Sequence, residues 1–154
     1  MNTYEKLVKQ CENEGIKIIE KTFKSNAKGL IKGNKIGISK NIDTVSEKRC
    51  VLAEEMGHYY TTTGNILDQS TIENRKQEYK ARKWGYNKLI GTQNIIKAFE
   101  YGCKNKHEIA EYLDVTVEFL ENSIECYKKV YGVFVNVEEY TIIFIPNLAV
   151  IKAL

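Results

Sequence analysis

The sequence predicts an α+β fold in which a small antiparallel sheet packs on two long helices, followed by a helix-turn-helix-like helical subdomain and a closing β-hairpin. Three observations predict it: β-rich runs near both ends, apolar residues at helical spacing between them, and helix-capping sequences before several helices. With 154 residues and 43% apolar content, the chain has the length of one domain. We expect a core over residues 1–91 and a helical subdomain with strands over 92–154.

The N-terminal part predicts one short helix followed by strands. Apolar residues at helical spacing precede Gly15, which ends the helix: Tyr4, Leu7, Val8 and Cys11. Residues 17–23 form the first expected strand. The pair Gly33-Asn34 tolerates positive φ and separates residues 30–32 from 35–38, so a tight hairpin is expected there.

Two capping boxes predict the two long helices. Thr44-Val45-Ser46-Glu47 precedes a helix expected over about residues 45–60, and Ser70-Thr71-Ile72-Glu73 precedes one that reaches Gly91. In this pattern a hydroxyl and a carboxylate satisfy backbone amides that the first helical turn leaves free. Residues 92–132 then predict three shorter helices, and β-branched residues predict strands over 133–137 and 140–145.

Charge and cysteine content exclude several classes of protein. The net charge of +3 is too small to indicate nucleic-acid or membrane binding by bulk electrostatics. The longest apolar run, residues 142–145, is far shorter than a membrane-spanning helix. Four cysteines without C-x-x-C spacing and an N-terminus without an apolar signal core predict a cytoplasmic protein with reduced thiols.

The segment Glu54-Glu55-Met56-Gly57-His58 predicts a metal site. Glu54 and His58 are four residues apart and share one helix face, while Glu55 points about 100° away. Peptidases with the H-E-x-x-H sequence use this spacing for two zinc ligands and a glutamate that takes a proton from zinc-bound water. Glu54 replaces the first histidine. Carboxylates bind zinc but add negative charge, so slower hydrolysis is expected. The alternative is an ordinary solvated helix face.

The block from Leu52 to Tyr60 resembles the Leu-Ala-His-Glu-Leu-Gly-His segment of the ImmA/IrrE metallopeptidase family, in a variant similar to its phage and mobile-element branch. Residues 78–86 resemble the second helix of that family. The resemblance implies a zinc peptidase with Glu78 as third metal ligand, although another divalent ion is possible. Small Ala81 and Gly85 leave room for the first long helix to pack closely. Asp68 is the competing third ligand.

The resemblance further implies a protein substrate, a helix-turn-helix repressor of the mobile element. We expect an edge strand around Ile36 to align the substrate by strand addition. Tyr59 is a weaker candidate, because its hydroxyl can donate to a developing oxyanion or simply pack in the core. His107 is excluded from the site. One alternative is an inactive relative that antagonises the repressor by binding it.

A second alternative is a DNA-binding regulator that uses residues 106–129. Residues 104–129 contain four lysines and six carboxylates, a local charge of −2, so direct nucleic-acid binding is not expected. Residues 17–49 show the opposite balance, with nine basic residues against Glu20, Asp43 and Glu47. An acidic protein partner fits that region, and a solvated sheet face is the simpler explanation.

Overall fold

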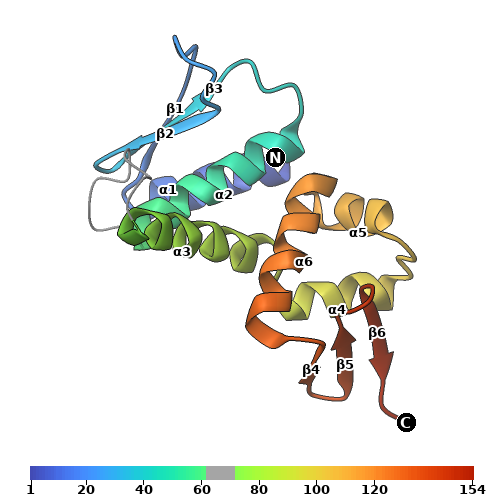
Figure 1. The fold of residues 1–154 in the computed structure, drawn as a ribbon. Coiled ribbons are helices and arrows are strands. Elements are labelled where there is room, and N and C mark those ends of the chain that lie inside the picture. Colours follow the sequence, from blue (N-terminus) through green and yellow to red (C-terminus); the bar gives the residue numbers. More distant parts are fainter. Residues whose placement is uncertain (62–71) are drawn as a thin grey trace. The chain divides into compact units, whose positions relative to one another are not determined.

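The computed structural model describes residues 1–61 and 72–154 and confirms the α+β class. In that part of the chain, helices and two small sheets form two compact units, Met1–Gly85 and Tyr86–Leu154 (Figure 1). Asp68 and the first two residues of the second capping box lie outside the described residues. No helix in the described ranges has the length and apolar content needed to cross a membrane.

The first unit begins with α1 (Thr3–Asn13), as predicted. Asn2 and Glu5 form a reciprocal capping box at its start, and the buried face consists of Tyr4, Leu7 and Cys11. Gly15 follows with φ of 84°, a left-handed conformation that favours glycine and turns the chain into β1 (Lys17–Lys21).

The first sheet is mixed, which corrects the antiparallel expectation. Its order is β1-β3-β2, where β2 (Gly29–Lys32) and β3 (Lys35–Ser39) form the predicted hairpin and β1 pairs with β3 in parallel. The turn sequence determines only the β2–β3 pairing. Because β3 is the strand with two fully buried isoleucines, Ile36 and Ile38, it takes the central position, and β1 then runs parallel to it.

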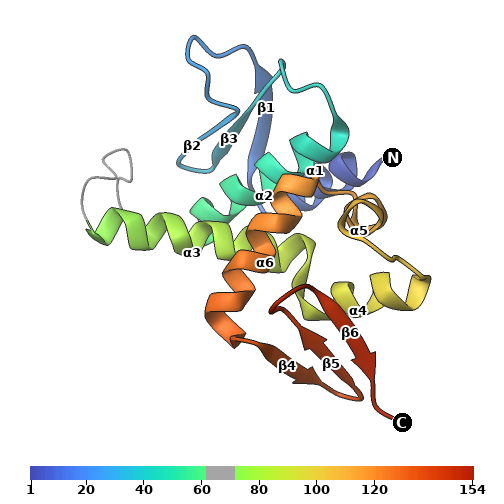
Figure 2. The same ribbon diagram turned by 45° about the vertical axis from the view of Figure 1, so that its right-hand side comes forward.

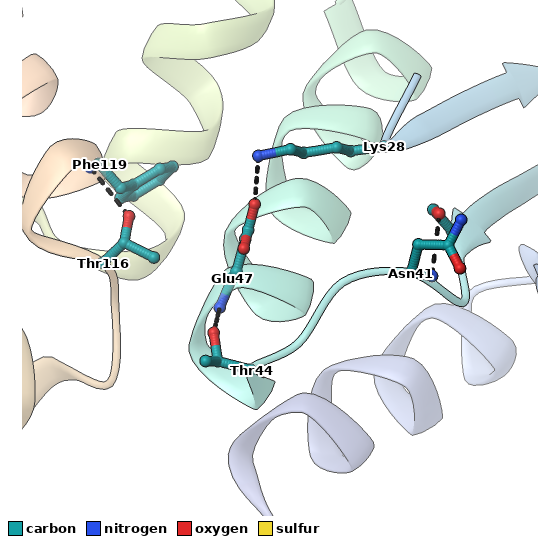
Figure 3. A network of polar contacts seen from close by, with 7 residues as sticks. Lys28, Asn41, Thr44, Glu47, Thr116 and Phe119 are labelled. Carbon is teal, nitrogen blue, oxygen red and sulfur yellow. Dashed lines mark hydrogen bonds and ion pairs between the residues drawn. The ribbon is translucent and has the colours of Figure 1, made fainter. Parts of the chain in front are cut away.

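The inner face of this sheet packs on α2 (Val45–Thr61), and α1 contacts both α2 and β1 (Figure 2). Thr44 caps α2 as predicted, since its Oγ1 accepts the Glu47 amide at 3.1 Å. The Glu47 carboxylate pairs with Lys28, which precedes β2 (Figure 3). The backbone amide of Asn41 donates to the Ser39 hydroxyl at 3.1 Å (Figure 3). Hydrogen bonds therefore fix both ends of the short connection between β3 and α2, the Asn41 bond at the β3 end and the Thr44 bond at the α2 end.

Small residues let α2 and α3 (Ile72–Leu89) approach closely. A Cβ built on Gly57 would overlap the Ala81 backbone carbonyl, and one built on Gly85 would lie 3.3 Å from the Ala53 carbonyl group. Residues 53 and 57 thus face residues 85 and 81, so the two helices cross in antiparallel order. The room predicted beside Glu78 is filled by the backbone of α2.

The second unit contains the three predicted shorter helices: α4 (Gly91–Tyr101), α5 (Lys106–Leu113) and α6 (Val117–Tyr131). Asn105 caps α5, and the Thr116 hydroxyl accepts the Phe119 amide at 3.1 Å to cap α6 (Figure 3). The buried Tyr127 hydroxyl donates to Asn87 Oδ1 at 3.0 Å and accepts the Gly91 amide at 3.1 Å. These two bonds join α6 to the end of α3 and to the start of α4.

A three-stranded antiparallel sheet closes the chain where a hairpin was expected. β4 (Phe134–Val137) and β5 (Tyr140–Ile143) form that hairpin, and β6 (Ala149–Lys152) pairs with the other edge of β5. With both edges paired, β5 is the central strand and buries Tyr140 and Ile142. The short β6 segment lacks a strong alternation of apolar and polar residues, which is why the sequence did not predict it.

We predict that Gly57→Ala destabilises the protein by about 3 kcal/mol, the upper part of the range for overpacking, because the new methyl group meets immobile backbone. Gly85→Ala is the matched control. Its methyl group would lie 3.3 Å from the Ala53 carbonyl group, a tight contact that a small helix shift can relieve, and the helix gains about 1 kcal/mol of propensity. Its net cost should therefore be well below that of Gly57→Ala. Urea denaturation of both variants measures the difference; equal effects would contradict the helix contact described above.

Candidate metal and catalytic site

The three residues of the predicted motif lie on α2 in the first unit. His58 is 9% exposed, and Glu54 and Glu55 are partly buried. Glu54 lies one helical turn before His58, close enough for its negative charge to raise the pKa of the His58 imidazole. The local fold thus places one imidazole and two carboxylates at the side of α2 that adjoins α3 and the sheet.

Glu78 on α3 reaches the same place. His58 Nε2 lies 3.2 Å from Glu78 Oε2, and the other carboxylate oxygen lies 3.2 Å from Arg82 Nε. The hydrogen bond with His58 lowers the pKa of Glu78, and burial opposes this shift. The positive charges of His58 and Arg82 lower the pKa of Glu78 further. Burial alone would lower the pKa of His58, but the bond to Glu78 and the surrounding carboxylates raise it. The structure therefore joins two predicted ligands directly.

Glu55 is the buried carboxyl group of the cluster. Burial raises the pKa of Glu55 to about 7, and the negative charges of Glu54 and Glu78 contribute to the rise. The positive charge of His58 opposes it. Gly29 of β2 lies against this side chain: a Cβ on Gly29 would be 3.0 Å from Glu55 Cγ and 3.1 Å from its Oε1. The edge strand β2 thus passes directly beside the predicted general base.

The donor types fit a divalent metal, while the arrangement presents only part of a ligand set. Imidazole and carboxylates are accepted zinc ligands. Within residues 1–61 and 72–154, no group of three or more His, Cys, Asp or Glu side chains is close enough to hold a metal ion. His58 and Glu78 are together, and Glu54 stands beside them on the helix without completing the group. Asp68 falls outside these ranges.

The remaining predicted residues have different positions. Ile36 lies in the central strand and is fully buried, so it has no free strand edge; the edge next to Glu55 belongs to β2. Tyr59 is partly buried, and its ring meets that of Tyr60 edge-on at 4.9 Å. Tyr60 stacks on Trp84 at 5.1 Å and donates to Glu14 at 2.8 Å, which makes it a packing residue. His107 is exposed on the second unit.

Sequence reasoning missed two residues that shape the cluster. Arg82 was not singled out from the sequence, and its half-exposed side chain contacts Glu78. Its spacing of four residues from Glu78 on one helix was the available signal. Gly29 was unremarked, and a glycine that begins a strand signals close approach of another group.

The pKa shifts predict how the stability of the metal-free protein depends on pH. The folded Glu55 holds a proton that the unfolded chain releases between pH 4.5 and about 7, so stability falls as pH rises through this range. The raised pKa of His58 extends the fall above pH 6.5, and the lowered pKa of Glu78 acts only at acid pH. Glu55→Gln should remove roughly 1–3 kcal/mol of this fall. Exposed Glu12→Gln is the control; equal slopes would contradict the buried carboxyl group.

The chain matches a known protein family over most of its length. The family model of the M78 peptidases, described as the IrrE N-terminal-like domain, matches residues 11–125. Curated proteins and solved structures gave no significant match. The matched range includes α2, α3 and every residue of the cluster. M78 peptidases are zinc-dependent, and membership implies a protein substrate. The chain thus belongs to the M78 peptidase family of IrrE- and ImmA-like proteins.

Proposed function

We propose that this protein is a metal-dependent endopeptidase whose site lies between α2 and α3. The observation that supports the proposal most directly is the contact of His58 with Glu78 across the two closely packed helices. A buried imidazole and a half-buried carboxylate, brought together by backbone-to-backbone packing, form a rigid pair of donors. The family membership gives this pair its chemical meaning.

In this proposal His58, Glu78 and Glu54 are the metal ligands. Zinc, when bound, supplies a Lewis acid that polarises the substrate carbonyl and makes bound water more acidic. His58 offers Nε2 and Glu78 its Oε2 once their mutual bond opens. Glu54, one helical turn before His58, would supply the third donor. Three ligands with two carboxylates also suit manganese or iron, so the donor set selects zinc less strongly than histidines do.

Glu55 has the position and environment of the general base. It lies beside the His58–Glu78 pair, is largely shielded from water and adjoins the β2 edge where a substrate backbone fits. Proton transfer is most efficient when the pKa of the group lies near the working pH. An extended peptide that adds to the free edge of β2 would run past Glu55, which gives β2 the alignment role expected of the strand around Ile36. Tyr59 adjoins the site as a weaker contact.

We propose a cytoplasmic helix-turn-helix repressor of a phage or mobile element as the substrate. The purified protein, loaded with zinc, should cut a repressor encoded beside it, and Glu55→Gln should slow the cut at least 100-fold, within the usual contribution of acid–base catalysis. Glu12→Gln should cut normally. Mass spectrometry of the fragments measures both. Cleavage that Glu55→Gln leaves unchanged would rule out this role.

The second candidate function is antagonism of the repressor by binding alone. It is favoured by the two contacts of Glu78, in which both carboxylate oxygens are engaged by protein side chains, one by His58 and the other by Arg82. Under this alternative the same Glu55→Gln protein still relieves repression of a reporter gene, and the repressor stays full-length. The reporter and the fragment analysis together separate the two candidates.

A further inference from the structure

The first sheet has an outer face, which is turned away from α2. Side chains of paired residues lie on the same face of a sheet, and alternate residues along a strand share that face. Ile36 and Ile38 are buried on the inner face, so the strand pairings assign one set of residues to the outer face. From the three strands this set is Lys17, Ile19, Lys21, Leu30, Lys32, Lys35, Gly37 and Ser39, of which Ser39 is itself buried.

The centre of the outer face is apolar and accessible. Ile19 and Leu30 are paired through Gly37 in one row across the sheet, and they are 36% and 48% exposed. Gly37 lacks a side chain, and the Phe23 ring occupies the vacant space: a Cβ there would lie 3.1 Å from Phe23 Cζ. Three apolar side chains therefore form a shallow, continuous patch around a glycine.

Lysines border this patch. Lys17 pairs with Lys35, and Lys35 pairs with Lys32, so three lysines form one row across the sheet. Neighbouring strands, and hence neighbouring lysine backbones, are about 4.8 Å apart. On the other side of the patch, Lys21 Nζ lies 5.9 Å from the centre of the Phe23 ring. Like charges directly across a sheet destabilise it, and in the described part of the chain none of these four lysines has an ion-pair partner.

No carboxylate of the sheet compensates this charge. Glu20, the one acidic residue of the three strands, pairs with Ile38 and therefore lies on the inner face. There it accepts hydrogen bonds from Lys48 at 2.9 Å and from Tyr4 at 3.3 Å. A cationic rim around an apolar centre thus remains open to a partner with the opposite pattern.

We infer that the outer face docks an acidic protein segment with apolar side chains at its centre. Carboxylates would meet the lysine row, and apolar side chains would cover Ile19, Leu30 and Phe23. A nucleic-acid backbone would satisfy the lysines but leave the apolar centre against phosphate and sugar. The choice of a protein over an anionic membrane rests on the proposed function, since a peptidase requires a protein partner. The surface itself is distinct from the His58 and Glu78 cluster.

The test uses metal-free full-length protein, so that docking is measured separately from cleavage. The probe is a fluorescent peptide in which leucines are flanked by glutamates, and binding is followed by anisotropy at low salt. Lys17→Gln, Lys32→Gln and Lys35→Gln together should weaken binding at least tenfold, and Leu30→Ser should weaken it about fivefold. The matched control changes three exposed or half-buried lysines on α3, Lys76, Lys80 and Lys83, to glutamine; it should bind within twofold of wild type.

Three results would overturn the inference: no binding of the probe, equal losses in the sheet and α3 variants, or an unaltered affinity after Leu30→Ser. A duplex DNA, or vesicles of phosphatidylcholine with phosphatidylserine, that bind the outer face more tightly than the peptide would assign it to another ligand. Circular dichroism of each variant shows that folding is retained. Wild-type protein that binds the probe peptide but shows no peptidase activity when loaded with zinc would count against the proposed function. That result would leave the docking inference standing.

Discussion

The contact between the Gly57 region of α2 and the Ala81 backbone of α3 is the constraint on which the candidate site depends. Hydrogen-bonding side chains can lie 3.2 Å apart across two helices only if the backbones hold that separation. Ala53 and Gly85 repeat the close approach one turn away, in antiparallel order. The helices therefore meet at two points, and His58 and Glu78 occupy the places beside them.

That proximity also creates the electrostatics of the cluster. Glu54, Glu55 and Glu78 surround one imidazole, and burial makes the mutual effects of their charges large. As a result the pKa of His58 is raised beside Glu78, whose own pKa is lowered, while burial raises the pKa of Glu55 to about 7. Arg82 adds a second cation on Glu78, which offsets part of the negative charge that Glu54 brings in place of a histidine.

Much of this could be predicted because the determining signals are local. Capping residues such as Thr44 and Thr116, the glycine turn at Gly33 and the four-residue spacing of Glu54 and His58 act within a few positions. The order of strands in the first sheet could not be predicted from local signals, because it depends on which strand is most buried. For that reason Ile36, expected at an edge, lies at the centre, and the third C-terminal strand was not foreseen.

The two histidines of the chain allow one direct test of the central claim, that His58 is held beside Glu78 as a metal ligand. Long-range proton–nitrogen NMR of tag-free protein resolves the ring nitrogens of both, and exposed His107 is the internal reference. One equivalent of zinc should convert His58 Nε2 to a metal-bound nitrogen without affecting His107, and Glu78→Ala should prevent the change. An unaltered His58 spectrum at saturating zinc would contradict the account.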